Sequence, residues 1–367
     1  MKSLVIRVDG NPTLGAGHVV RCVALAQQAQ KIGCEVCFVV SDRLSARLLQ
    51  MHGYDATIVD GDAACLTAKD GLCLAAVSVT RSAGCVLVDS YAVNTSFFNA
   101  LKSGLAGHSV IIAYIDDRYS LSDGILGPDV VWPVDILVSY LFNAEQVYGG
   151  KSCQFDARCL LGSSFAPVRS QFQGVAYDVR KKVQNILITC GSTNQCKVLE
   201  RIVDAVQPLS KGMDINLVVG CQADFIGKLP KNFHVLKSVK NMAALTRSAD
   251  IAISAAGTTL YELCAIGIPT VAIPIVENQI PNVKAFVAVK AGRGLIGLDW
   301  TADCVSGQLE MLLLSEEKRK AYSSKMRQLV DGNGAARLLG AFSSISKTLA
   351  KDAFQFQKIG RSKKLQS

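Results

Sequence analysis

The chain has 367 residues, of which half are hydrophobic and 19% are charged, so its length and composition predict two domains with ample apolar cores. The formal net charge is +9, and residues 351–367, with five Lys or Arg and one Asp, account for +4 of it, which predicts a solvated basic tail. The body has no basic helix face, no aromatic-rich RNA-binding strand and no run of about 18 apolar residues, so neither a nucleic-acid partner nor a transmembrane helix is expected.

Thirteen cysteines are scattered singly through apolar segments, a pattern typical of reduced, buried thiols in the cytoplasm. One C-x-x-C pair, Cys34 and Cys37, enters a predicted strand, where residues three apart point to opposite faces. No second pair completes a zinc site, so core cysteines are the better interpretation, and neither a metal nor another cofactor is expected. The opening MKSLVIRVDG has no small-residue cleavage site and is interpreted as a first strand, not a signal peptide.

The first part of the chain alternates apolar strands with helical segments. Strands are predicted over residues 4–9, 35–40, 85–89 and 110–116, and a helix is predicted over 18–31. Apolar runs this continuous are typical of parallel sheets covered on both faces, and their alternation with helices implies right-handed βαβ units.

A polar stretch without clear periodicity, residues 165–182, is predicted to link this part to a second one. The pattern then restarts, with strands predicted over 185–191, 215–220, 233–239, 250–257 and 268–274, and a helical stretch over 316–349 that closes the second half. The expected organisation is a domain over 1–164, the linker, a domain over 183–350 and the tail, with a cleft between the two domains.

Ligands of open α/β sheets bind beyond the carboxyl ends of the strands. Polar loops follow six predicted strands, after Asp9, Asp89, Asp116, Cys190, Ala256 and Pro274. Two of these loops, starting with Asp89-Ser90-Tyr91 and Asp116-Asp117, should face the cleft. Adjacent residues at a strand end point opposite ways and no further ligand completes a site, so Asp116 and Asp117 favour a salt bridge or a turn over a metal site.

The first loop, LGAGHVVRC, places His18 at a predicted helix start behind Gly15 and Gly17. The glycines let the backbone approach a ligand, and the positive end of the helix favours the neutral imidazole that a general base requires. A histidine that caps its own helix is the alternative. A dinucleotide-binding fingerprint is disfavoured, because Val20 stands where its third glycine belongs and five residues separate Gly15 from the strand.

A second constellation lies in SAAGTTLYEL, where Gly257, Thr258 and Thr259 follow a predicted strand and open a helix. Backbone N–H groups, two hydroxyls and the helix dipole together suit a phosphate. Glu262 lies one turn further on, where it could accept hydrogen bonds from ribose hydroxyls. The alternative is a threonine that caps the helix, with Glu262 as its capping-box partner.

Two more polar turns complete the candidate site. The stretch ENQIPN supplies amides that suit sugar hydroxyl and acetamido groups, those of Asn278, Gln279 and Asn282, and a plain turn is the alternative. The stretch CGSTN is either a tight βα turn or a second wall for the same diphosphate, formed by Gly191, Ser192 and Thr193.

These segments resemble the UDP-sugar hydrolases of pseudaminic acid biosynthesis, which hydrolyse UDP-2,4-diacetamido-2,4,6-trideoxy-β-L-altropyranose. The resemblance rests on RVDGNPTLGAGHVVRCVALA, VDSY, IDDR, LLGSSFAPVR, ILITCGSTN and SAAGTTLYELCAIGIPTVAIPIVENQ, and it extends in the family's order to about residue 300. The second half is also similar to the nucleotide domain of the transferase that adds N-acetylglucosamine to the lipid-linked cell-wall precursor. Both resemblances imply the GT-B fold, an α/β architecture of two Rossmann-like parallel-sheet domains facing a cleft.

The resemblance implies that His18 is the general base, that Tyr91 and Asn278 lie in the sugar site, and that Glu262 binds ribose while residues 257–259 bind the diphosphate. The wider expected substrate-binding set adds Arg7, Asp9, Gly15, Gly17, Arg21, Asp89, Gly191, Ser192, Thr193, Gln279 and Asn282. The chain departs from the family in two ways: Gly191-Ser192-Thr193-Asn194 replaces its usual Gly-Gly-Thr-Asp, and the chain extends past the family's usual end.

The expected activity is therefore cytoplasmic hydrolysis of a UDP-activated diacetamido-trideoxyhexose in nonulosonic (pseudaminic-type) acid biosynthesis. Water deprotonated by His18 attacks the anomeric carbon from the face opposite UDP, which inverts that carbon without a metal. A glycosyltransferase of the same fold, in which His18 deprotonates an acceptor hydroxyl, is one alternative. A hydrolysing UDP-sugar 2-epimerase and a catalytically silent UDP-sugar-binding domain are the others, and the oligomeric state is left open.

Overall fold

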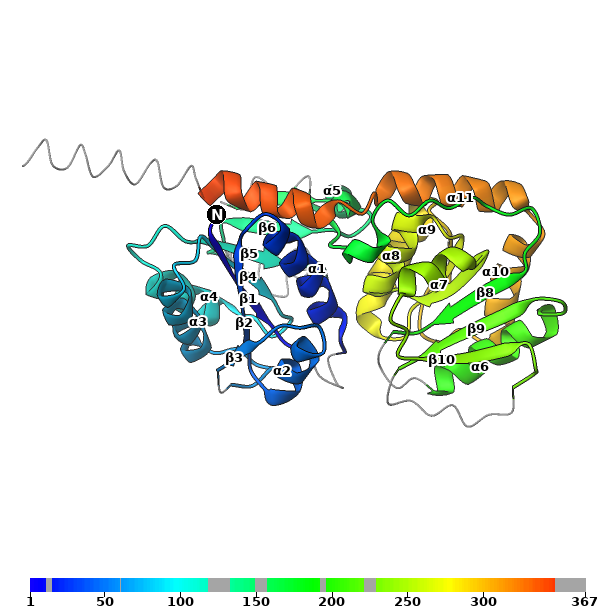
Figure 1. Ribbon diagram of the computed structural model, residues 1–367, viewed down its shortest axis with the longest axis horizontal. Coiled ribbons are helices and arrows are strands. Elements are labelled where there is room, and N and C mark those ends of the chain that lie inside the picture. The colour runs from blue at the N-terminus through cyan, green and yellow to red at the C-terminus, as the bar shows by residue number, and fades with distance from the viewer. Residues whose placement is uncertain are drawn as a thin grey trace, which may run out of the picture.

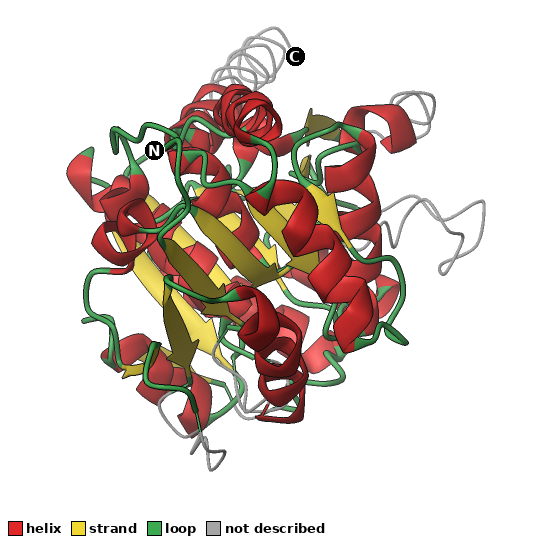
Figure 2. Cartoon of the chain, turned by 90° about the vertical axis from the view of Figure 1, so that its right-hand side faces the viewer, coloured by secondary structure: helices red, strands yellow, loops and turns green. Residues whose placement is uncertain are grey.

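Two parallel β-sheets, each covered by helices, form the two halves of the molecule (Figure 1). The computed structural model describes residues 1–10, 15–59, 61–117, 133–148, 157–191, 196–220 and 229–346. Every pair of named strands in these residues is parallel, and helices lie on both sides of the strands (Figure 2). The predicted α/β class with two parallel sheets is confirmed.

The first sheet has seven strands in the order β3-β2-β1-β4-β5-β6-β7. They are β1 (Ser3–Val8), β2 (Glu35–Val40), β3 (Ala56–Ile58), β4 (Cys85–Asp89), β5 (Ile111–Ile115), β6 (Ile136–Ser139) and β7 (Arg158–Leu161). The helices of this half are α1 (Gly17–Lys31), α2 (Arg43–Gln50), α3 (Ala68–Thr80), α4 (Thr95–Gly104) and α5 (Ala144–Tyr148). Strands β1, β4, β5 and β6 are buried along their whole length, which explains their continuous apolar runs.

The second sheet has six strands in the order β10-β9-β8-β11-β12-β13. They are β8 (Asn185–Thr189), β9 (Asp214–Val219), β10 (Phe233–Lys237), β11 (Ile251–Ala255), β12 (Thr270–Ile273) and β13 (Arg293–Gly294). The helices of this half are α6 (Cys196–Val206), α7 (Met242–Ser248), α8 (Thr258–Ile266), α9 (Ile280–Ala288), α10 (Ala302–Leu313) and α11 (Glu316–Leu329).

The chain crosses between the halves twice. The first crossing contains residues 165–182, and although the stretch is polar overall, Ala166, Val168 and Phe172 are buried in it. After α11 the chain returns, and a helix over residues 334–346 lies along the first half (Figure 1). Gly334 packs so tightly there that a β-carbon would lie 2.1 Å from the Ala166 carbonyl oxygen. The prediction that residues 316–349 close the second half is therefore wrong for their last part.

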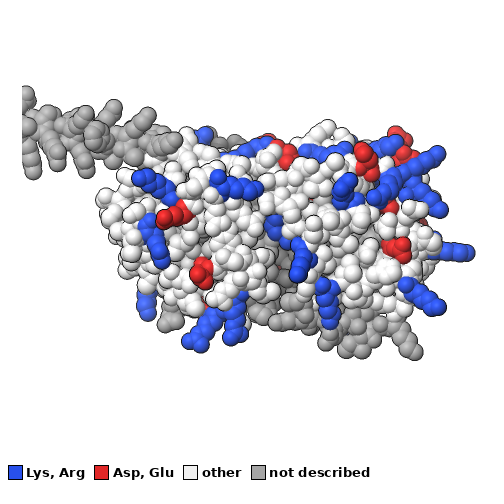
Figure 3. Space-filling view, viewed as in Figure 1, with Lys and Arg blue, Asp and Glu red and all other residues white. Residues whose placement is uncertain are grey.

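Cysteines and charges complete the description of the fold. All eleven described cysteines are free thiols, but only five of them are buried and Cys65 and Cys304 are exposed, so the prediction of buried thiols is correct in part. Figure 3 shows Lys and Arg spread over both halves and interspersed with Asp and Glu on the face in view. Within the described residues, no helix is both long and apolar enough to cross a membrane.

Candidate active site

The candidate residues lie at the topological switch point of each sheet, where the strand order reverses. In the first sheet β1 is flanked by β2 and β4, so the crevice between β1 and β4 is a switch point, and the same holds for β8 and β11 in the second sheet. Switch points are where open α/β sheets bind ligands. His18 follows β1 and Asp89 ends β4, while Gly191 follows β8 and Gly257 follows β11.

His18 and Asp89 form the centre of the first half's site. His18 Nδ1 lies 2.6 Å from Asp89 Oδ1, and both side chains are buried. No hydrogen bond joins Nε2 to another residue of the described chain. Arg21 Nη2 also lies 2.8 Å from Nδ1, and the shorter contact with the Asp89 carboxylate favours the tautomer with its proton on Nδ1. An imidazole that donates from Nδ1 to a carboxylate keeps the lone pair of Nε2 for a proton, which is the arrangement of a general base. The alternative of a histidine that caps its own helix is not observed, because α1 has Ala16 as N-cap and no side-chain cap hydrogen bond.

Arg21, one turn after His18, holds the carboxylates of this cluster. Its Nε donates to Asp89 Oδ2 at 2.6 Å, and its Nη2 donates to Asp89 Oδ1. Its Nη1 donates to Asp117 Oδ2 and to the Tyr140 hydroxyl. Protein acceptors therefore surround the guanidinium. Arg21 orients the site through Asp89, Asp117 and Tyr140 and not by direct contact with a substrate.

These contacts fix the protonation of the cluster. Burial alone would raise the pKa of Asp89, but Arg21 and then His18 outweigh it and hold that pKa well below its usual range. Burial, followed by the nearby Asp117 carboxylate, raises the pKa of Tyr91 well above its usual range. Asp89 is therefore a carboxylate and Tyr91 a neutral phenol across the working pH range of an ordinary enzyme.

The starts of α1 and α8 lack the side-chain caps found on six other helices of the described chain. Gly257 is the N-cap of α8, so the alternative in which Thr258 or Thr259 caps the helix with Glu262 is not observed. Backbone N–H groups at such a start are available to an anion. Because Thr258 Oγ1 donates to the Gly17 carbonyl oxygen at 3.3 Å, a ligand at the α8 start lies beside the start of α1.

The predicted sugar-site residues are brought together from both halves. The Tyr91 ring meets the His18 ring edge-on with centroids 4.4 Å apart, and Asn278 Nδ2 donates to the Tyr91 hydroxyl at 3.3 Å. Gln279 accepts a hydrogen bond from the Ile275 amide through Oε1, and a β-carbon on Gly257 would lie 3.5 Å from its Nε2. Amide donors from residues 278–279 thus adjoin both the tyrosine and the α8 start.

Other predicted residues are engaged with the protein itself. Arg7 and Asp9 are buried and bind one another at 2.7 Å, and the Ser41 amide donates to Asp9 on the β2 side of β1. Both oxygens of Glu262 are bound by Arg169 of the first crossing, at 2.8 Å for Nη2 with Oε2. Burial raises the pKa of Glu262 despite this partner. Any ribose hydroxyl would therefore share the Glu262 carboxylate with Arg169.

Three further positions need separate mention. Asn282 is buried and its amide joins the Tyr261 hydroxyl to the Ala256 carbonyl oxygen, so it stabilises the turn before Gly257. Gly15 and Gly191 both have a φ of +79°, a conformation that favours glycine. Ser192, Thr193 and Asn194 lie outside the described residues, as do Arg118 and the tail.

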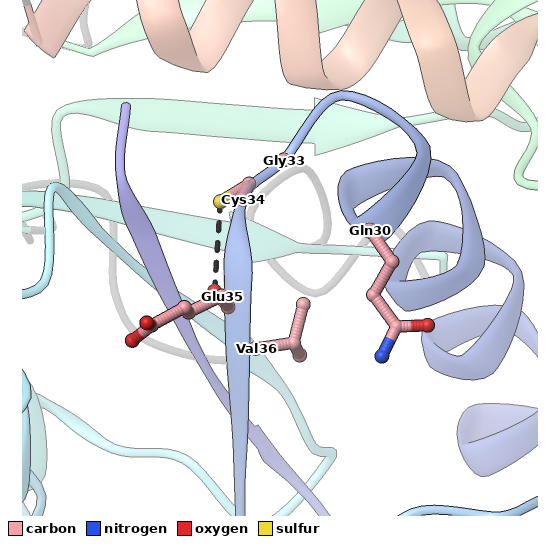
Figure 4. A pocket seen from close by; sticks show the side chains of 5 residues that line it. All are labelled: Gln30, Gly33, Cys34, Glu35 and Val36. Carbon is pink, nitrogen blue, oxygen red and sulfur yellow. Dashed lines mark hydrogen bonds between the residues drawn. The ribbon is translucent and has the colours of Figure 1, made fainter.

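Two cavities lie at the opposite edges of the sheets. One of about 400 Å³ is at the amino end of β2, lined by Gln30, Gly33, Cys34, Glu35 and Val36 (Figure 4). Another of about 500 Å³ precedes β8 and β9, lined by Lys181, Lys182, Val183, Met213 and Leu313. The candidate catalytic groups are at the carboxyl ends, so neither cavity belongs to the site.

Two facing switch points on two parallel sheets define the GT-B fold. The structure of MurG from Acinetobacter baumannii has a TM-score of 0.64 and 19% sequence identity to this chain, covering 94% of this chain and 100% of that one. Residues 185–338 match the glycosyltransferase family 28 C-terminal domain. The predicted GT-B fold is therefore confirmed.

Two curated proteins show more specific similarity. The spore coat polysaccharide biosynthesis protein SpsG of Bacillus subtilis is 27% identical over 200 residues, 50% of this chain and 58% of that protein. The pseudaminic acid cytidylyltransferase and UDP-2,4-diacetamido-2,4,6-trideoxy-beta-L-altropyranose hydrolase of Helicobacter pylori is 27% identical over 283 residues, 75% of this chain and 44% of that protein. The matched part of this chain spans about half the length of these relatives.

Proposed function

We propose that this chain is a UDP-sugar hydrolase acting on a UDP-activated diacetamido-trideoxyhexose. The observation that carries the proposal is the His18–Asp89 pair, with His18 in the first turn of the helix whose start touches the uncapped start of α8. A base and an anion seat in contact are what hydrolysis of a sugar diphosphate needs. The hydrolase named in the Helicobacter pylori relative supports the substrate class.

The reaction needs one proton transfer and one displacement. His18 Nε2 takes a proton from water as the water oxygen bonds to the anomeric carbon. The bond from that carbon to the diphosphate oxygen breaks, and UDP leaves with the bonding electrons. Asp89 stabilises the imidazolium that forms, because its carboxylate faces Nδ1. Attack from the face opposite UDP inverts the anomeric carbon.

The second half holds the leaving group in this proposal. The N–H groups at the start of α8 and the Thr259 hydroxyl bind the diphosphate, and Gln279 Nε2 adds a donor beside Gly257. The Thr258 hydroxyl joins them when it exchanges its bond to the Gly17 carbonyl oxygen for one to the diphosphate. Glu262 binds ribose while Arg169 retains its place on the carboxylate. Neutralising the diphosphate at the helix start makes UDP a good leaving group.

The sugar occupies the space bounded by Tyr91 and Asn278. The Tyr91 phenol is neutral, accepts a hydrogen bond from the Asn278 amide and is hydrogen-bonded to Asp117, so it holds Asn278 in place beside its ring. The Asn278 amide can both donate and accept hydrogen bonds with acetamido and hydroxyl groups. Because Tyr91 comes from the first half and Asn278 from the second, the sugar binds only when the halves are together.

A glycosyltransferase is the second candidate, and the family 28 match over residues 185–338 favours it. The same His18 would then deprotonate an acceptor hydroxyl instead of water. The test measures UDP release from a panel of UDP-diacetamido sugars without an acceptor. Release at a steady rate in the wild type, lost in His18→Asn but kept in a variant of the exposed His108, supports the hydrolase.

Release that begins only when an acceptor sugar is added supports the transferase instead. A product with altered C2 configuration indicates a hydrolysing 2-epimerase. Tight binding of UDP with no release under any of these conditions indicates a binding domain, and each of these three results contradicts the hydrolase.

A further inference from the structure

A buried aromatic contact joins the two halves next to the candidate site. Tyr140 follows β6 in the first half and Tyr261 lies in α8 of the second, and their rings meet edge-on with centroids 5.1 Å apart at 86°. Phe142 stacks on the Tyr261 ring at 4.8 Å and 11°. All three side chains are buried. Aromatic pairs have preferred geometries and few rotatable bonds, so this contact is directional and stiff.

On the first half, the contact is bonded to the catalytic cluster. The Tyr140 hydroxyl accepts a hydrogen bond from Arg21 Nη1. The same guanidinium donates to both oxygens of Asp89, which in turn orients His18. A shift of Tyr140 is therefore transmitted to the imidazole through buried, charge-assisted hydrogen bonds.

On the second half, the contact is bonded to the turn that begins α8. The Tyr261 hydroxyl donates to Asn282 Oδ1 at 2.7 Å. Asn282 Nδ2 donates to the Ala256 carbonyl oxygen at 2.8 Å, and Ala256 immediately precedes Gly257, the N-cap of α8. Hydrogen bonds on either side of the Tyr140–Tyr261 ring contact thus connect His18 with the proposed diphosphate site.

We propose that the Tyr140–Tyr261 contact sets the position of the general base relative to the UDP seat, and that both tyrosines are positioning residues. This inference deepens the proposed function and rests on it for the reaction itself. The base and the seat belong to different halves, so the attack geometry depends on how the halves are aligned. Because a misplacement of about 1 Å can lower a rate about 100-fold, a stiff contact between the halves matters for turnover.

The test compares Tyr140→Phe, which keeps the ring and removes the hydroxyl, with Tyr140→Leu, which removes both. The matched control is Tyr177→Phe, which removes a buried hydroxyl bonded to the Asp250 carbonyl oxygen at the amino end of β11. For each variant, kcat for UDP release is measured together with the affinities for UDP and for UDP-N-acetylglucosamine by calorimetry, and folding is checked by circular dichroism.

We expect kcat to fall about tenfold in Tyr140→Phe and about 100-fold in Tyr140→Leu, with the control unchanged. In the proposed function the diphosphate and ribose of UDP are held by α8, so UDP affinity should stay within about twofold. The sugar of UDP-N-acetylglucosamine also reaches Tyr91 of the first half, so this compound should bind roughly fivefold or more weakly to Tyr140→Leu. If Tyr140 had only a structural role, its substitution would lower the melting temperature but would not lower kcat while leaving UDP affinity unchanged.

Two results separate the inference from the proposed function. A wild type that turns over while folded Tyr140→Leu keeps its kcat and both affinities overturns the positioning role and leaves the hydrolase intact. A wild type that releases no UDP from any UDP-sugar overturns the hydrolase, and the difference between UDP and UDP-N-acetylglucosamine binding then decides the positioning role alone. If Tyr140→Leu does not fold, Tyr140→Phe carries the same comparisons.

Discussion

Replacing His18 by Asn is the most direct perturbation of the proposed mechanism. Asparagine is well tolerated near a helix start, and it removes the only group in the cluster that we expect to take the water proton. The rate of UDP release should fall about 10²–10⁴-fold, the usual contribution of a general base. UDP affinity should be unchanged, because the proposal places UDP at the start of α8. The hydrogen bond from that helix start to α1 goes to the Gly17 carbonyl oxygen and not to the imidazole.

The structure also limits how much stability the substitution removes. His18 supplies one hydrogen bond to Asp89, at 2.6 Å, and Arg21 still binds both Asp89 oxygens without it. A hydrogen bond to a charged group contributes about 1.5–3 kcal/mol. The edge-on contact with the Tyr91 ring adds about 0.5–1.5 kcal/mol. The sum of these two losses is smaller than the free energy of unfolding of an ordinary domain, about 5–15 kcal/mol, so the variant should fold.

The assay follows UDP release at saturating substrate, with UDP affinity from calorimetry and the free energy of unfolding from urea titration. The exposed His108, changed to Asn in the same half, is the matched control and should keep the wild-type rate. A folded His18→Asn protein that turns over within a few-fold of wild type refutes the reasoning, and the base would then have to be sought among Asp9, Asp89 and Tyr91.

Activity should survive excess EDTA, because Asp89 and Asp117 are both bound by Arg21, and a loss restored by Mg²⁺ or Mn²⁺ would contradict this. Glu262→Ala should weaken UDP binding by about 1–3 kcal/mol through lost ribose hydrogen bonds. Arg169→Ala breaks the same ion pair but keeps the carboxylate, so calorimetry should show its UDP affinity preserved, and equal losses in both variants would refute the ribose role. Burial opposes ionisation of Asp89 but Arg21 holds its pKa well below the usual range, so this carboxylate stabilises the fold above about pH 4 and that contribution is lost as the pH falls further. In urea titrations the stability difference between wild type and Asp89→Asn should therefore shrink from pH 6 to pH 2.5, and a constant difference would argue against the charge effect.

The sequence predicts much of the fold because parallel strands are buried on both faces. Every strand predicted from an apolar run is present, with ends within two residues of the prediction. The pattern misses β3, β6, β7 and β13, which have only two to four residues and are too short to show a period. It also misses the return of residues 334–346 to the first half, since amphipathicity indicates that a helix has a buried face but not which surface covers it.

The sequence predicts those site residues that directly follow a strand. It does not predict the contacts between side chains that lie far apart in the chain. His18 and residues 257–259 follow strands at the two switch points, so local pattern is enough to find them. The bonds from Arg21 to Asp117 and Tyr140 link segments about 100 residues apart, and the Arg169–Glu262 pair spans 93 residues. The stretch LLGSSFAPVR contains Arg169, but nothing local to it singles out this residue or indicates its partner.

The second crossing of the chain has a consequence for how the protein is made. Leu338, Leu339 and Phe342 are buried in the same cluster as Leu4 and Val8 of β1, so the surface of the first half is covered by a helix translated more than 300 residues after β1. Domains generally fold in the order of their synthesis. Here the first half leaves the ribosome with that surface open, and it is completed only after residue 346 has emerged. The packing of the first half is therefore completed only after the second half has been translated.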